Sequence, residues 1–89
     1  MKSVLIADGN SAARTALPRL FEQEGWNVCG EASDGEQALA KGQELSPDLI
    51  VLELSMRAMN GLTARILEKT MPHIRLILAP SVVWLIATN

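Results

Sequence analysis

Two hydrophobic patterns alternate along residues 3–79 of the chain. Short runs of consecutive apolar residues, typical of strands covered on both faces of a sheet, are separated by stretches with apolar residues at helical spacing. The pattern predicts strands over residues 3–7, 26–32, 49–53 and 74–79, and helices over residues 12–24, 34–45 and 60–72. Strands that alternate with helices predict right-handed crossovers and a mainly parallel sheet with helices on both faces.

The helix boundaries have their own signals. Asn10 or Ser11 is the expected N-cap of the first helix. Ser33 and Glu36 match a capping box, in which the hydroxyl and the carboxylate each bind a backbone N–H at the helix start. Pro18 lies inside the first helix and lacks the N–H of a helix interior, a defect of about 3 kcal/mol unless the helix kinks or starts late. The first helix therefore contains a local conflict.

Apolar spacing also predicts which side chains of the later helices face inward. The second helix has its expected inner face at Ala38, Leu39, Gly42 and Leu45. The third helix, with Asn60 as its cap and Pro72 as its end, has one side formed by Leu62, Ile66, Leu67 and Thr70.

Polar residues follow the predicted strands at one edge of the sheet. In an open parallel sheet the functional crevice lies at the carboxyl ends of the strands. Asp8, Glu53 and residues 79–81 are expected to meet there. Asp8 is either a member of an acidic pocket or a charge favoured near a helix N-terminus.

Composition narrows the class of protein. The 89 residues predict one domain over 1–89, and an apolar share of 48% suits a globular core. A net charge of −2 disfavours direct nucleic-acid binding. Cys29 is the only cysteine, which suits a reducing cytoplasm, and no run approaches the roughly 20 apolar residues of a membrane span. We expect a cytoplasmic protein without membrane contact, with Cys29 as a small buried side chain.

Four segments, VLIADGNSAARTAL, VCGEASDGEQAL, SPDLIVLELSM and MNGL, resemble response-regulator receiver domains of two-component signalling in order and spacing. The resemblance implies a flavodoxin-like α/β fold with a doubly wound parallel sheet and helices on both faces. We expect the sheet to be incomplete, with four to five strands. Residues 80–89 form an atypical apolar tail.

The resemblance also implies a phosphoryl-transfer site. Family members have an acceptor aspartate at the end of strand three, and the matching residue here is Glu53. The two family acids after strand one match Asp8 and Gly9, and a family carbonyl ligand matches Ser55. The resemblance therefore implies a weak Mg²⁺ site formed by Asp8, Glu53 and the Ser55 carbonyl.

Two further family groups have no match in the chain. The hydroxyl after strand four falls at Ala79 or Pro80, with Ser81 one or two positions late, and no lysine follows Lys69. These departures predict a pseudo-receiver with impaired phosphoacceptance. Glu53 is then either a built-in mimic of the phosphorylated state or the solvated carboxylate of a decayed site.

The resemblance implies a binding and switching module rather than an enzyme. Expected partners are a histidine kinase, another receiver domain or a second copy of the chain, with Trp84 as an interface candidate. Alternatives are a phosphorylation-independent interaction or dimerisation domain, and a nonfunctional fragment of a response regulator. His73 has no Cys or second His beside it, so we do not expect it to bind metal.

Overall fold

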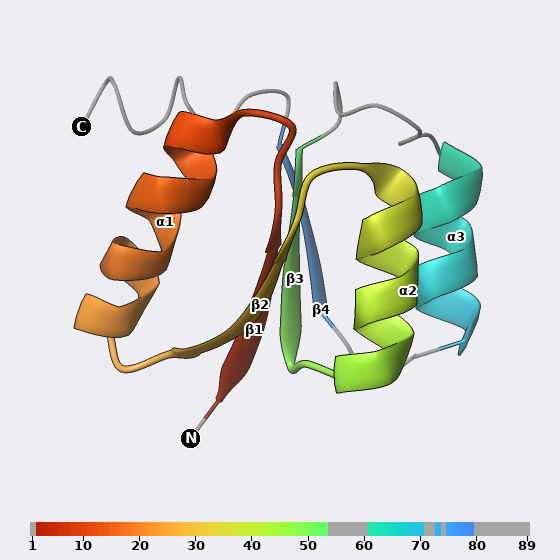
Figure 1. The fold of residues 1–89 in the computed structure, drawn as a ribbon. Coiled ribbons are helices and arrows are strands. Elements are labelled where there is room, and N and C mark those ends of the chain that lie inside the picture. The colour runs from red at the N-terminus through yellow and green to blue at the C-terminus, as the bar shows by residue number, and fades with distance from the viewer. Residues whose placement is uncertain (1, 54–60, 71–72, 74, 80–89) are drawn as a thin grey trace.

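A computed structural model of the chain describes residues 2–53, 61–70, 73 and 75–79, with side chains described at 2–53, 65–70, 73 and 75. Strands and helices alternate along these residues, as the sequence predicts (Figure 1). The elements are β1 (Ser3–Ala7), α1 (Ser11–Gln23), β2 (Asn27–Ala32), α2 (Gly35–Leu45), β3 (Leu49–Glu53), α3 (Gly61–Thr70) and β4 (Arg75–Ala79).

The strands form one parallel sheet in the order β2-β1-β3-β4. Helix α1 covers one face, whereas α2 and α3 lie side by side on the other (Figure 1). The strand order reverses at β1, as in doubly wound flavodoxin-like sheets. The predicted fold class is therefore confirmed, with four strands among the described residues.

The core has two layers because successive side chains of a strand point to opposite faces of the sheet. Leu5 and Ala7 of β1 belong to the cluster under α2 and α3, whereas Val4 and Ile6 belong to the cluster under α1. Continuous burial along β3 follows from helices on both sides.

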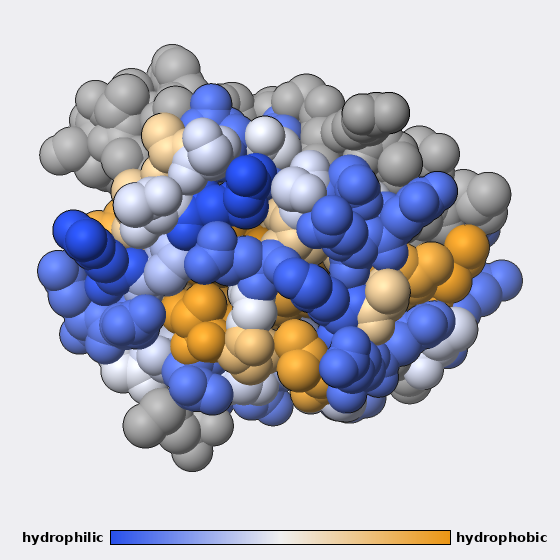
Figure 2. Space-filling model, in the orientation of Figure 1, coloured by the Kyte–Doolittle hydropathy of each residue, from blue (hydrophilic) through white to orange (hydrophobic). Residues whose placement is uncertain are grey.

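Strand β2 lies at an edge of the sheet and contains a bulge. Val4 pairs with Val28 but Leu5 pairs with Gly30, so Cys29 is the extra residue. Figure 2 shows apolar side chains emerging among polar ones over β2, between α1 and α2. A bulge twists an edge strand and disfavours edge-to-edge pairing with another sheet.

Helix α1 begins as predicted at its Asn10 cap, whose side chain accepts hydrogen bonds from the N–H groups of Ala12 at 2.8 Å and Ala13 at 3.2 Å. The helix is continuous from Ser11 to Gln23 with Pro18 inside it, so it does not start late. Its apolar stripe, packed on β1, stabilises the helix despite the hydrogen bond that Pro18 cannot make.

The start of α2 differs from the predicted capping box. Asp34 is the N-cap, and its carboxylate accepts a 2.8 Å hydrogen bond from the N–H of Gln37. The Gln37 side chain accepts from both the N–H and the hydroxyl of Ser33, each at 3.0 Å. The prediction of Ser33 and Glu36 is therefore wrong by one residue, because Asp34 supplies the charged acceptor at the extended position.

The inner face of α2 is shorter than predicted. Ala38 and Gly42 are buried and Leu39 packs at the edge of the core, but Leu45 is 39% exposed. Leu45 is the last helical residue before Ser46, which adopts the left-handed conformation at φ 45°, and its side chain reaches over Gly30 at the sheet edge. Leu45 therefore contacts the sheet from the end of the predicted inner face but is not a buried core residue.

Helix α3 faces the core through Leu67, which is buried, and through the half-buried Ile66. Thr70 is exposed and donates its hydroxyl to the Ile66 carbonyl, so its grouping with the apolar side is wrong. Asn60, Pro72, the Leu62 side chain and residues 80–89 lie outside the described part. Among the described residues, none of the helices has the length and apolar character needed to cross a membrane.

Candidate functional site

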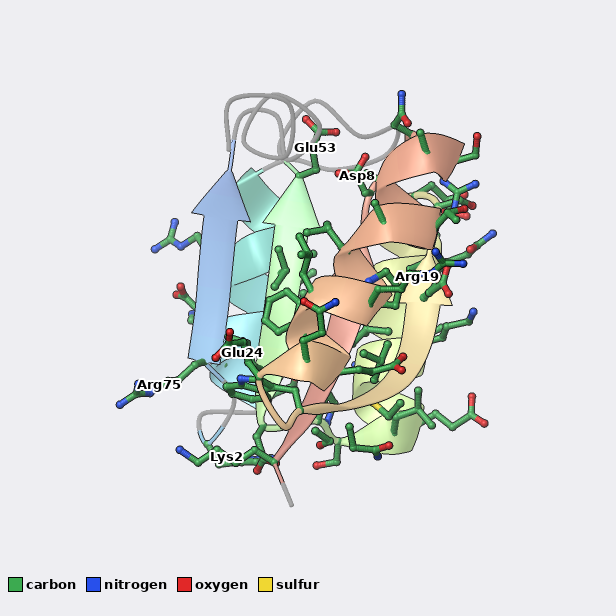
Figure 3. All side chains as sticks on the ribbon, turned by 90° about the vertical axis from the view of Figure 1, so that its left-hand side faces the viewer. Lys2, Asp8, Arg19, Glu24, Glu53 and Arg75 are labelled. Atoms are coloured by element: carbon green, nitrogen blue, oxygen red, sulfur yellow. The ribbon has the colours of Figure 1, made fainter. Side chains whose placement is uncertain are left out.

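Two carboxylates lie together where β1 and β3 end. Ala7, the last residue of β1, pairs with Leu52 of β3, so Asp8 and Glu53 are the next residues along adjacent strands. Their side chains lie near one another at the carboxyl edge of the sheet (Figure 3). The structure thus brings together two of the residues that the sequence analysis placed in the crevice.

Both carboxylates of this acidic pair are buried. Asp8 is 1% exposed and Glu53 is 6% exposed, the values of core residues. Buried carboxylates need hydrogen bonds or opposite charge nearby, since water no longer solvates them. Glu53 is therefore not a solvated carboxylate, and that part of the decayed-site hypothesis is wrong.

The loop after β1 holds Asp8 through several hydrogen bonds. The Asp8 N–H donates to the carbonyl of Ala32 at 3.0 Å, which continues the pairing of β1 with β2. The N–H of Asn10 donates to Asp8 Oδ1 at 2.8 Å. Asp8 Oδ2 is buried without a hydrogen-bond partner among the described residues. One carboxylate oxygen is therefore satisfied, and the other is buried without a donor from the described residues.

Burial raises the pKa of the Asp8 carboxyl above its usual value of 3.8. The hydrogen bond from Asn10 opposes this increase in the pKa because it stabilises the ionised form. The negative charge of Glu53 raises the pKa further, whereas the positive charge of Arg14 lowers it. Asp8 therefore responds electrostatically to both neighbours.

Arg14 is a site residue that the sequence analysis does not single out. It lies one turn into α1, is half-buried, and donates from Nη1 to the carbonyl oxygen of Asp8 at 2.7 Å. Its position four residues after the Asn10 cap, away from the apolar stripe, is the signal that could have identified it. A side chain there can reach back over the end of β1.

The acidic pair fits a hard divalent cation. Mg²⁺ prefers oxygen ligands and is commonly held by one or two carboxylates with water completing the coordination. Asp8 Oδ2, buried without a donor, has the chemistry of such a ligand, and the Glu53 carboxylate lies at the adjacent strand end. No third carboxylate, cysteine or histidine joins them within the described ranges. Any further ligands would have to come from backbone, from water or from residues outside those ranges.

The remaining predicted residues are either outside the described part or not in the acidic pair. Ser55 and Trp84 fall outside the described residues, so their roles as metal ligand and interface residue stay predictions. Cys29 is half-buried on β2, where its thiol donates to the Val4 carbonyl at 3.4 Å and burial raises its pKa. His73 is exposed with Nε2 at 2.9 Å from the Ser46 hydroxyl, far along the chain from the acidic pair.

Sequence comparison places the chain among signalling proteins. The family model of the response regulator receiver domain matches residues 4–81. A protein-glutamate methylesterase/protein-glutamine glutaminase of Maricaulis maris is 41% identical over 78 residues, which cover 85% of this chain and 20% of that protein. The chemotaxis protein CheY of Thermotoga maritima is 38% identical over 63 residues, which cover 71% of this chain and 52% of that protein. The chain thus spans about half or less of these relatives.

Solved structures agree with the sequence comparison. The response regulator domain of Thermotoga maritima CheB superposes with a TM-score of 0.75 at 32% identity, covering 88% of this chain and 59% of that one. A response regulator of the LuxR family from Aurantimonas, at 24% identity, shares the fold with a TM-score of 0.78 over 85% of this chain and 56% of its own. The chain therefore belongs to the response regulator receiver domains of two-component signalling.

Proposed function

We propose that the chain is a receiver module of phosphorelay signalling whose capacity to accept a phosphoryl group is impaired. The observation that supports this function is the acidic pair itself, two buried carboxylates at the adjacent ends of β1 and β3. The impairment follows from the residue types, because a glutamate stands at position 53 and a glycine at position 9.

Glu53 is a poor acceptor for geometric reasons. Its extra methylene moves the carboxylate by roughly the length of a carbon–carbon bond, and a misplacement of about 1 Å can reduce a rate on the order of 100-fold. The backbone of β3 cannot retreat to compensate, because Leu52 and Glu53 are paired with β4 and buried. In-line attack on a phosphoryl donor is therefore disfavoured.

The missing acid at position 9 weakens binding of the cation that the reaction requires. A metal ion neutralises the phosphoryl oxygens during transfer, and its affinity rises with the number of carboxylates around it. Asp8 and Glu53 would hold Mg²⁺ with one carboxylate fewer than a pocket with an acid at position 9. We infer weak Mg²⁺ binding and slow phosphotransfer.

We infer a binding and switching role in the cytoplasm, with no catalytic activity of the chain's own. A histidine kinase or another receiver domain is the proposed partner, and a net charge of −2 argues against direct contact with nucleic acid. We do not infer the activity of the methylesterase relative for this chain, because the chain covers 20% of its length.

Restoring aspartate at positions 9 and 53 tests the impairment. The parent chain and the double variant Gly9→Asp/Glu53→Asp are incubated with acetyl phosphate and Mg²⁺, and intact mass spectrometry measures the phosphorylated fraction. Among the described glycines, the one with a positive φ is Gly25. Gly9 therefore has a negative φ, which an aspartate can also adopt. We expect phosphate on the double variant and none on the parent.

The single variants separate the two causes. Glu53→Asp alone should reach a lower phosphorylated fraction than the double variant, because its cation site still lacks one carboxylate. Stable phosphate on Glu53 of the parent would refute the impairment. A double variant that stays unphosphorylated while folded would refute the assignment of the impairment to positions 9 and 53.

A second function, a phosphorylation-independent interaction domain, is supported by a groove on α1. Leu17, Leu20, Phe21, Glu24 and Trp26 line this groove of about 210 Å³. Leu20 is 46% exposed there, and exposed apolar surface favours association. If the chain dimerises through this groove, Leu20→Ser should shift sedimentation velocity from dimer to monomer, whereas a monomeric parent would exclude dimerisation.

A further inference from the structure

The first turn of α1 holds the Arg14 guanidinium beside Asp8. Arg14 Nη1 donates to the Asp8 carbonyl at 2.7 Å, and the Arg14 N–H donates to the Asn10 carbonyl at 3.2 Å within the helix. The backbone of Asn10 in turn donates to Asp8 Oδ1. Backbone and side-chain contacts therefore join Arg14 to the residue whose Oδ2 is buried without a donor.

Two buried carboxylates at adjacent strand ends require positive charge nearby, since their mutual repulsion is strong where water is excluded. Arg14 supplies a permanent positive charge beside Asp8, because its guanidinium donates to the Asp8 carbonyl and does not lose its proton in proteins. Three other cationic side chains of the described part lie farther from Asp8 in Figure 3, with Arg19 lower on α1 and Lys2 and Arg75 at the opposite edge of the sheet.

A divalent cation at the acidic pair would meet the same need for positive charge. The ion would approach carboxylates next to the positive charge of Arg14. The two positive charges would repel each other. A half-buried guanidinium is screened less by salt than one in bulk water. Arg14 and the cation are therefore electrostatic competitors at Asp8.

We propose that Arg14 is a tethered counter-ion of Asp8 and thereby limits the affinity of the acidic pair for a divalent cation. The inference rests on the proposed function only in taking the acidic pair as the cation site. It predicts that Gly9 is one cause of weak Mg²⁺ binding and Arg14 a second, independent one.

The test measures Mg²⁺ binding by isothermal titration calorimetry at constant ionic strength, without any phosphoryl donor. We expect Arg14→Gln to bind Mg²⁺ on the order of tenfold more tightly than the parent, from the repulsion between a single and a double charge near one pocket. Arg14→Lys should stay near the parent, since it keeps the charge. Circular dichroism of each variant confirms that it is folded.

Arg19→Gln is the matched control, because it removes the same charge from an exposed position on the same helix. It should change the affinity by less than about twofold, since exposed charges are screened by solvent and salt. Asp8→Asn should abolish binding and thereby locate the ion.

Four results would overturn the proposal. Three are an unchanged or weaker affinity in Arg14→Gln, an equal gain in Arg19→Gln, and Mg²⁺ binding that survives Asp8→Asn. Absence of binding in both the parent and Arg14→Gln would also overturn it. None of these outcomes depends on phosphorylation, so a failure here is distinguishable from a failure of the receiver chemistry.

Discussion

The backbone N–H of Asn10 donates a 2.8 Å hydrogen bond to Oδ1 of Asp8, so the residue that caps α1 also holds the buried carboxylate at the end of β1. The strand end, the loop and the helix start are thereby joined in one short segment. The other oxygen, Oδ2, has no such donor among the described residues. Asp8 is therefore stabilised on one side only, and its charge remains a cost to the fold.

Removing that charge should stabilise the protein at neutral pH. Asp8→Asn keeps an oxygen that can accept from Asn10 and replaces the charged Oδ2 with an amide that can donate to Glu53. We expect a gain of about 1 kcal/mol, which raises the Tm by roughly 4–8 °C for a domain of this size. Asp8→Ala, which loses the acceptor for Asn10, is the control. Thermal unfolding at pH 7 measures both, and an Asp8→Asn variant less stable than the parent would contradict the expectation.

The contribution of Asp8 should also depend on pH. Because the pKa of Asp8 is raised in the folded state, that state binds more protons than the unfolded chain between 3.8 and the raised value. The free energy of unfolding should therefore fall as pH rises through this window. The difference between Asp8→Asn and the parent isolates the effect. This difference in the free energy of unfolding, measured with urea, should be small below pH 3.8 and should grow toward neutral pH. A pH-independent difference would refute the prediction.

Asp48 should show the opposite dependence. Its Oδ2 accepts from the N–H of Ser3 at 2.7 Å and from the Ser3 hydroxyl at 3.2 Å, and these hydrogen bonds, the N–H above all, lower its pKa below 3.8. The stabilisation is present above pH 3.8 and is lost as pH falls through the lowered pKa. Asp48→Asn should therefore be less stable than the parent at pH 7 and converge with it in acid. Ser3→Ala, which keeps the N–H, should lose less stability than Asp48→Asn. Equal losses would contradict the leading role of the Ser3 N–H.

The start of α2 allows a test of the predicted capping box of Ser33 and Glu36 against the Asp34 N-cap of the structure. Asp34→Ala removes the acceptor for the Gln37 N–H and should lower the free energy of unfolding by about 1 kcal/mol. Glu36→Ala should change it by less than about 0.5 kcal/mol, since Glu36 is an exposed residue of the first turn. Chemical denaturation measures both variants. A larger loss in Glu36→Ala would restore the predicted box.

Much of the fold could be predicted from the sequence because its elements are specified by local patterns. The apolar runs that became β1 and β3 and the helical spacing of α1 each lie within a few consecutive residues. Alternation of strands and helices then leaves few topologies apart from a parallel sheet. The Asn10 cap follows from the same local chemistry.

Details that depend on neighbours far along the chain could not be predicted in this way. Leu45 lies on the apolar stripe of α2, yet it stays 39% exposed because it ends the helix over Gly30 of the edge strand β2. Ser33 and Asp34 are both good caps by residue type, and the backbone conformation at the end of β2 selects Asp34.

The sequence by itself determined the strands, the helices and the family, and it placed Asp8 and Glu53 at strand ends. The tertiary structure alone decided that both carboxylates are buried and that Arg14 lies against Asp8. The physical reason is the register of β1 and β3, which joins residues 45 positions apart, and the packing of α1 across that edge. Burial and electrostatic environment depend on the whole surroundings of a group, and no local pattern encodes them.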